Sequence, residues 1–510
     1  MSSALLLADR FIWLTPSWLF AMGILAGLMI LLLLWGVARL ASPAVGRWLW
    51  DTATEGVLLP IFATAAVISV YALMVLVAAI TFESKQLNVG TMATSLSRVL
   101  ANDNLTQTVP LKPSEKNRAV VFDASPVEIA EVHVTPLHNA ELMLVLPGDP
   151  AFSPFQPRTI IDPKQTYTWK RSGKQRYYFT GEQVKFYLTN NTNLDNPVEV
   201  RLVATAEHPQ VAAIPATALV LISGVLAYFL FSWLFPRISA VANTTMKEAI
   251  YQPIYGIVLC LILAFIFIQL VIPLYTFGED IKGYKENVLT VLTVFSLLVA
   301  IWTASNTIAD EIDGRTALTV LSKPISRLEF VVGKYFGVLF PVMILFLIGS
   351  LFFIGCIPFK MVYDSRESSQ LNVSWQQGYE EIRTILPGLA LTLMQIMCLT
   401  SISVAISTRL SMLVNMIITL TIYVLGNLLP QLVQSSRIGT DYNLDKLVEF
   451  SARFFATIFP TLETYNIHAA ITAGQEVPLQ YLGLTLVYTL LYCGMALLVS
   501  LLLFEDRDLS

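Results

Sequence analysis

Long apolar stretches alternate with shorter polar segments along the chain, and this pattern predicts membrane-spanning helices. A helix rises about 1.5 Å per residue, so about 20 apolar residues without a charge are needed to cross the hydrocarbon layer. Nine stretches meet this criterion, lying roughly at residues 17–38, 56–81, 211–235, 253–275, 287–309, 335–357, 385–406, 411–432 and 480–504. We therefore expect a polytopic α-helical membrane protein with about nine transmembrane helices and with its termini on opposite sides of the membrane.

One segment between the second and third predicted spans has the opposite character. Of the 68 charged residues, 26 lie between Glu83 and Glu207, and short β-type runs replace long apolar ones from Ala119 to Pro209. The runs 183–188 and 198–203 alternate polar with apolar residues, which predicts two adjacent antiparallel strands. We expect an exterior, all-β, sandwich-like insert over residues 83–210.

Composition agrees with a membrane protein. Hydrophobic residues make up 55% of the chain and charged residues 13%, where soluble domains average about a quarter charged. The net charge of −4 gives no basic surface for nucleic acid. All four cysteines lie in or at the edges of predicted spans, so we expect no disulfide framework.

The distribution of Lys and Arg sets the expected orientation, because these residues concentrate in cytoplasmic loops. They are denser in the loops 236–252, 310–334 and 407–410, and in the C-terminal tail, than in the alternate loops. We therefore place these loops and the C-terminus in the cytoplasm, and the N-terminus and the insert outside. The expected domains are 1–82 with two spans, 83–210, the third span at 211–235, and a six-helix core at 236–510 with an exterior segment at 433–479.

Three of the four histidines, His133, His138 and His208, fall in the insert and raise the question of a metal site. His133 and His138 are five residues apart, so on a continuous strand they would face opposite sides of the sheet. No cysteine accompanies them. The sequence favours ordinary surface or core histidines, and we assign no metal site.

All nine predicted spans lack Asp, Glu, Lys, Arg and His. Ion-coupled transporters and most intramembrane enzymes need ionisable groups at depth. Polar residues such as Gln395, Asn415 and Asn427 can instead hydrogen-bond between helices. The chain also has no G-x-x-x-x-G-K-[ST] phosphate loop, since Gly333-Lys334 lacks both the preceding glycine and the following Ser or Thr. A transport function would therefore need energy from a separate protein.

The loop 310–334, between the fifth and sixth spans, could receive that energy. Residues 316–321 predict a short apolar helix that ends before Pro324. A second short helix can start after Ser326, with Glu329 as its capping-box partner. The result is a rigid knob with charged flanks that fits a socket on a soluble partner, although an ordinary charged juxtamembrane loop fits the pattern equally well.

Residues 237–251 predict an amphipathic helix along the membrane surface. A simple extension of the neighbouring span is the alternative. The apolar face comprises Ile238, Val241, Thr245 and Ala249, and the charged residues Arg237, Lys247 and Glu248 lie elsewhere.

From this helix onward the sequence resembles the membrane subunits of type-2 ABC transporters, the ABC-2 permeases. Their coupling loop typically carries an acidic residue, a Gly-Thr-like step, two leucines, Pro-x-x-Arg and Gly-Lys. Here Arg315 interrupts the Gly-Thr step, and the resemblance extends from about Pro236 to Ser510. The matching residues are Glu311, Gly314, Thr316, Leu318, Leu321, Pro324, Arg327, Gly333 and Lys334.

The resemblance implies a permease subunit that forms a homodimer, or a heterodimer with a related permease, and binds two separate ATP-binding-cassette ATPases. ATP and magnesium would be held by that partner, and this chain would have no cofactor and no catalytic site. The expected function is ATP-driven transport, as an exporter. The implied ATPase-coupling residues are Asp310, Glu311, Gly314, Arg315, Leu318, Leu321, Pro324, Arg327 and Lys334, together with Arg237, Lys247 and Glu248 on the interfacial helix.

The exterior segment 433–479 carries an apolar stripe before Pro460, which predicts helices that dip back toward the membrane as an external gate. A surface amphipathic helix is the alternative. The stripe comprises Leu444, Leu447, Phe454, Phe455 and Ile458.

Two other functions stay open from the sequence. One is a non-transporting membrane scaffold that anchors an exterior complex through the insert. The other is a membrane-embedded transferase, for which His468 with Glu463 is a weak polar candidate.

Overall fold

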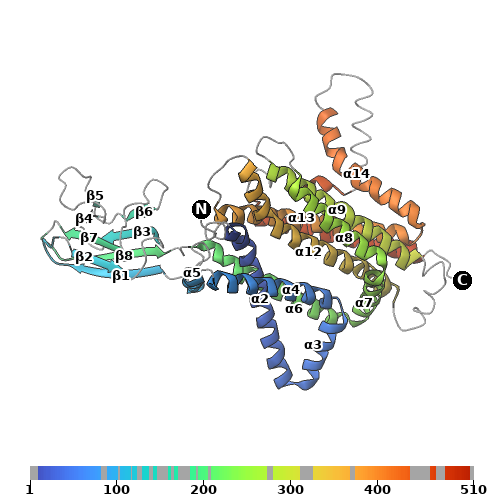
Figure 1. The fold of residues 1–510 in the computed structure, drawn as a ribbon, viewed down its shortest axis with the longest axis horizontal. Coiled ribbons are helices and arrows are strands. Elements are labelled where there is room, and N and C mark those ends of the chain that lie inside the picture. The colour runs from blue at the N-terminus through green and yellow to red at the C-terminus, as the bar shows by residue number, and fades with distance from the viewer. Residues whose placement is uncertain are drawn as a thin grey trace. The chain divides into compact units, whose positions relative to one another are not determined.

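The computed structural model describes residues 10–81, 89–101, 104–116, 118–122, 129–136, 142–145, 159–161, 166–170, 184–190, 193–204, 208–272, 280–309, 326–367, 374–436, 460–466 and 477–505. The chain divides into two compact units, one formed by Met1–Val75 together with Ile214–Ser510 and the other by Leu76–Ala213. Figure 1 shows the helical bundle of the first unit and the strands of the second. The expected domain boundaries stay predictions.

The first unit is built from helices. Several of them begin at proline, whose missing N–H costs nothing at a first helical position. The helices are α2 (Arg10–Ala41), α3 (Pro43–Glu55), α4 (Leu58–Thr81), α6 (Ala213–Leu234), α7 (Pro236–Tyr251), α8 (Pro253–Val271), α9 (Asp280–Ala304), α12 (Arg327–Glu367), α13 (Trp375–Ser407), α14 (Met412–Ser436) and α17 (Leu479–Glu505), with a π-helical turn η3 (Ser305–Ala309) and a 3-10 turn η4 (Leu462–Tyr465).

Eight helices among the described residues are long and apolar enough to cross a membrane, so the chain is a multi-pass membrane protein. The ninth expected span, 411–432, corresponds to α14, whose apolar part Met412–Leu428 is shorter than the others. The number of nine spans therefore stays a prediction. The eight are α2, α4, α6, α8, α9, α12, α13 and α17.

Three helices form the centre of the bundle. In α9, α12 and α13, 61–67% of the most apolar window is buried, against 17–22% in the other five spans. Their shared core includes Leu292, Val342 and Ile385, each fully buried. The outer helices expose apolar side chains on their remaining faces, as expected for surfaces in contact with lipid tails.

The central helices are longer than the apolar stretches that predict them, and they bury two lysines whose carboxylate partners are partly exposed. Lys285 on α9 is 1% exposed and pairs with Glu381 on α13. Lys360 on α12 is fully buried, 3.0 Å from a carboxylate oxygen of Asp364. These residues lie just beyond the predicted spans, where a charge is ordinarily taken for a solvated helix end.

The second unit contains α5 (Val89–Ala101), a 3-10 turn η2 (Pro209–Ala212) and two four-stranded sheets. These sheets fit the β-rich insert, whose all-β, sandwich-like character stays a prediction. One sheet has the order β1-β8-β3-β6 and the other β2-β7-β4-β5. The strands are β1 (Asn104–Leu111), β2 (Arg118–Phe122), β3 (Ile129–Pro136), β4 (Leu142–Val145), β5 (Thr159–Ile161), β6 (Tyr167–Lys170), β7 (Val184–Asn190) and β8 (Asn196–Ala204).

The prediction that the runs 183–188 and 198–203 pair with each other is wrong. They form β7 and β8, which lie in different sheets: β8 pairs with β1 and β3, and β7 with β2 and β4. Alternation correctly identifies the buried face of β8, where Val198, Val200 and Leu202 are fully buried, but it carries no information about the partner strand.

The histidines show no metal geometry in the described part of the insert. The ring nitrogens of His133 lie 3.2 Å from the Thr168 hydroxyl and 3.1 Å from Glu131 Oε2. No group of three or more His, Cys, Asp or Glu among the described residues could hold a metal ion. His138 lies outside the described residues.

Candidate functional site

The predicted amphipathic helix is present as α7, which starts at Pro236 and ends before Pro253. All four residues of its predicted apolar face are buried. Arg237, Lys247 and Glu248 are exposed. Its position at a membrane surface and its contact with a partner stay predictions.

Helix α12 begins at the capping box expected from the sequence. The backbone N–H and hydroxyl of Ser326 donate to Glu329 Oε2 over 2.8 and 3.0 Å, and the Glu329 N–H donates to the Ser326 hydroxyl over 3.2 Å. These bonds satisfy donors that a helix start leaves open. The expectation of a separate short helix is wrong, because the helix continues without a break for 41 residues to Glu367.

Two glycines bring α12 into close contact with α7. A β-carbon at Gly333 would lie 2.7 Å from Val241 Cβ, and one at Gly337 would lie 2.5 Å from Thr245 Cβ. Both are closer than real β-carbons come to a neighbour. Gly333 and Gly337 form a G-x-x-x-G pattern, which lets two helix backbones approach closely.

The side chains around this contact divide into exposed and buried groups. Arg327 is exposed. Arg237 Nη1 on α7 lies 3.4 Å from Glu329 Oε1 on α12. Lys334 is only 4% exposed, and its ammonium lies 5.7 Å from the centre of the Phe330 ring. Lys334 therefore contributes to packing in this structure, whereas Arg327 and Arg237 face outward.

The start of α12 also contacts the end of α17, and the end of α17 contacts the turn between α13 and α14. The rings of Phe330 and Phe504 stack with centroids 5.6 Å apart. Arg409 Nε donates to the carbonyl oxygen of Leu503 over 2.7 Å. The four segments α7, the start of α12, the α13–α14 turn and the end of α17 therefore lie at one end of the bundle.

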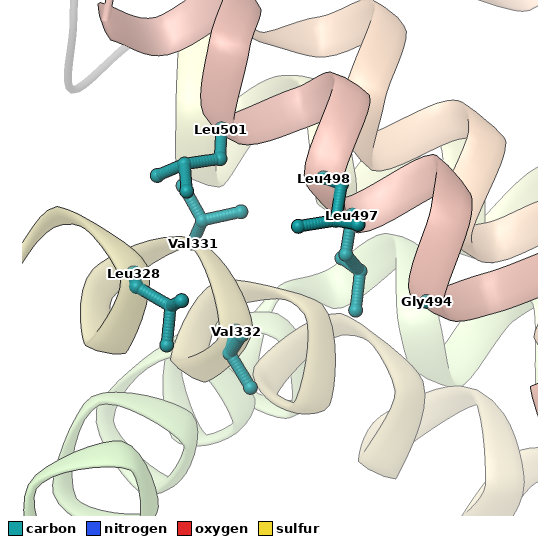
Figure 2. Close-up of a pocket in the computed structure, with 7 residues that line it drawn as sticks. All are labelled: Leu328, Val331, Val332, Gly494, Leu497, Leu498 and Leu501. Carbon is teal, nitrogen blue, oxygen red and sulfur yellow. The ribbon is translucent and has the colours of Figure 1, made fainter.

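A groove of about 300 Å³ separates the first turns of α12 from the last turns of α17, and Figure 2 shows its lining. All its lining residues are apolar, so it offers no group for acid–base or metal chemistry. They are Leu328, Val331 and Val332 on α12, and Gly494, Leu497, Leu498 and Leu501 on α17.

At the opposite end of α14 and α17, the short turn η4 enters the bundle. Leu462 is fully buried and Tyr465 is 1% exposed. A β-carbon at Gly426 on α14 would lie 2.7 Å from the side chain of Leu462. The Tyr465 hydroxyl lies 2.8 Å from the Thr489 hydroxyl on α17. The five residues of the predicted apolar stripe, and His468, lie outside the described residues.

Most of the predicted coupling residues also lie outside the described residues, which resume at Ser326. Of the described ones, Arg327 and Lys334 lie on the first turns of α12, and Arg237 lies on α7, which packs against α12. The residues that the structure does not describe are Asp310, Glu311, Gly314, Arg315, Leu318, Leu321 and Pro324.

Residues 278–509 match the family model described as ABC-2 family transporter protein. This part of the chain, somewhat less than half of it, is therefore similar to the ABC-2 family transporter proteins. The matched segment contains the three central helices with α14 and α17, whereas α7 and α8 precede it. Because α7 packs on α12, a helix outside the matched segment still belongs to the same site. No curated protein sequence matches the chain.

Proposed function

We propose that this chain is the permease subunit of an ATP-binding-cassette transporter, and that a separate ATPase subunit binds where α7 meets the start of α12. The observation that carries the proposal is the glycine-mediated contact of Gly333 and Gly337 with α7. It joins the C-terminal arm of the loop 310–334 to the helix expected to lie along the membrane surface. A push on either element would therefore move both.

Helix α12 offers a direct route from this contact into the bundle. It runs as one helix from Arg327 to Glu367, which at about 1.5 Å per residue is about 60 Å. It packs against both other central helices. An ATPase that binds one permease conformation more tightly than another shifts the populations of the two, because a partner moves an equilibrium by its difference in affinity.

Charged side chains at this end suit a soluble partner. Arg327, Arg237, Lys247 and Glu248 are exposed around the contact. Such residues set the encounter and orientation of two proteins more than their affinity. ATP and magnesium would be held by the ATPase, and this chain would contribute no catalytic group of its own.

We place this end of the bundle in the cytoplasm and propose that the protein is an exporter of the bacterial inner membrane. The density of Lys and Arg in the loops supports this orientation. The N-terminus and the β-rich insert would then lie outside. The buried turn η4 would lie at the outer side, where it suits an external gate because it inserts Leu462 and Tyr465 among α13, α14 and α17.

The test is copurification of the chain with an ATP-binding-cassette ATPase whose hydrolysis depends on Glu311, Pro324 and Arg327. Alanine at these positions is expected to reduce permease-dependent ATP hydrolysis without loss of the folded permease. Arg383→Ala is the matched control, because Arg383 is an exposed arginine at the opposite end of the bundle. An unchanged ATPase partnership after replacement of residues 310–325 would refute the proposal, and would favour a scaffold or a transferase.

A further inference from the structure

A buried polar cluster joins the π-helical turn η3 to two helices. We call it the Asn415 cluster: Ser305, Ser403, Asn415 and Thr419. Asn415 Nδ2 donates to the hydroxyls of Ser305 on η3 and Ser403 on α13, over 2.9 and 3.1 Å. The Thr419 hydroxyl donates to Asn415 Oδ1 over 3.0 Å. Every member is at most 1% exposed.

The turn η3 directly precedes the coupling loop 310–334. Its residues, Ser305–Ala309, are π-helical. A π-helix bonds residue i to i+5, so a π-helical turn inserts about one extra residue relative to an α-helix, and such turns are frequent at functional sites. Relaxation of the turn to an α-helix would rotate the entrance of the loop by about 100°. The bond from Asn415 to Ser305 holds the first residue of this turn.

The Asn415 cluster also couples movement of η3 to movement of α14. Breaking its bonds would leave buried donors and acceptors unsatisfied, which is costly. A displacement of η3 therefore takes α14 with it as long as the bonds hold. At its other end α14 contacts the buried turn η4 through Gly426 and Leu462.

We propose that Asn415 is a positioning residue that transmits displacement of the coupling loop to α14, and through α14 to the turn η4. This inference rests on the proposed permease function. It gives the loop two attachments to the bundle, one at its exit through α12 and α7, and one at its entrance through η3 and α14.

Asn427 provides a matched comparison within the same helix. Its side-chain amide donates to the carbonyl oxygen of Tyr423, on α14 itself, over 2.8 Å. A substitution of Asn427 removes the same chemical group from α14 without touching η3.

The experiment measures whether nucleotide binding to the ATPase moves α14. The permease, with its four cysteines replaced by alanine, is reconstituted with its ATPase in liposomes and carries nitroxides at Leu428 and Leu479. These positions are exposed at the η4 end of α14 and α17. Pulsed electron paramagnetic resonance gives the distance between the nitroxides before and after trapping with ATP and vanadate.

We expect the parent protein to change this distance on trapping. Asn415→Leu loses the side-chain hydrogen bonds that hold the cluster together. The fraction of molecules that change should fall at least about tenfold, since the net loss of one to two hydrogen bonds already has that effect. The Asn427→Leu protein should respond like the parent, and ATPase copurification should be unchanged in all three. Ser305→Ala, which removes only the bond to η3, should show the same defect more weakly. Its control is Ser407→Ala, because the Ser407 hydroxyl donates to Val404 within α13.

A parent-like response in Asn415→Leu would overturn the inference and leave the proposed function standing. If Asn415→Leu does not fold, a parent-like response in Ser305→Ala overturns it instead. A parent protein that neither copurifies with an ATPase nor responds to trapping would refute the proposed function itself.

Discussion

Gly333 on α12 lies so close to Val241 on α7 that a β-carbon at position 333 would be 2.7 Å from Val241 Cβ. The nearest backbone atom to that β-carbon would be the carbonyl oxygen of Ile238, at 3.2 Å. A side chain at position 333 therefore requires the two helices to separate. The site depends on this approach, because it joins the end of the coupling loop to α7.

Gly333→Ala should consequently weaken both the fold and the coupling site. We expect the free energy of unfolding to fall by about 1–3 kcal/mol, the usual cost of overpacking, and ATPase copurification to decrease. Thermal unfolding in detergent and pull-down of the ATPase measure the two effects. Gly355→Ala is the control on the same helix, since beyond the adjacent backbone of α12 itself no described atom would lie within 4 Å of its β-carbon. Equal behaviour of the two variants would contradict the packing described here.

Ser326→Ala should loosen the first turn of α12. The hydroxyl of Ser326 accepts from the Glu329 N–H and donates to its carboxylate, so its loss leaves the first turn without the reciprocal cap. Amide hydrogen exchange is expected to speed up at Arg327–Phe330 and stay unchanged further along the helix. Ser374→Ala, in the capping box of α13, should affect only the start of α13. Protection that stays intact at α12 in Ser326→Ala would show that the cap is not needed.

The sequence predicts the local features of this site and misses the long-range ones. The capping box at Ser326 and the apolar face of α7 follow from spacing within a few residues, and both are present. The role of Gly333 is different, because its partner Val241 lies 92 positions earlier and no local pattern names it. The same limit explains β8, whose buried face is correctly predicted while its partner strands are not.

The sequence does not reveal the buried lysines for a related reason. Lys285 precedes an apolar stretch and has the pattern of a solvated helix end, yet the structure buries it. Its partner Glu381 lies on another helix. The sequence indicates that Asn415 can hydrogen-bond between helices, but nothing in it predicts the π-helical turn that holds its partner Ser305.

The Lys285–Glu381 pair should be sensitive to removal of one partner alone. Glu381→Gln leaves the buried ammonium of Lys285 without its carboxylate, and we expect a loss of about 1–3 kcal/mol in the free energy of unfolding. The double variant Lys285→Met with Glu381→Gln should recover part of this loss, because no uncompensated charge remains. Thermal unfolding compares the two. Glu380→Gln is the neighbouring control, because its pair with Arg383 is about half exposed and such surface pairs contribute about 0–1 kcal/mol. A double variant less stable than Glu381→Gln would show that the uncompensated charge of Lys285 is not what destabilises the single variant.

Gly426→Ala should displace the buried turn η4. A β-carbon there would lie 2.7 Å from Leu462 Cγ and 3.3 Å from the carbonyl oxygen of Pro460, so the turn must shift. In a cysteine-free background with Leu462→Cys, labelling by a membrane-impermeant maleimide from outside should increase severalfold. Gly483→Ala on α17 is the control, since beyond the adjacent backbone of α17 itself no described atom would lie within 4 Å of its β-carbon. Unchanged labelling in Gly426→Ala would show that the turn η4 does not pack against Gly426.

The central claim is that an ATPase binds where α7 meets the start of α12, and the most direct test is a photo-cross-link from Arg327. A benzophenone amino acid at this exposed position, irradiated in intact membranes that contain the ATPase, is expected to form one dominant adduct with an ATP-binding-cassette subunit, identified by mass spectrometry. Adducts formed only with lipid, or only with proteins on the exterior side of the membrane, would contradict the account.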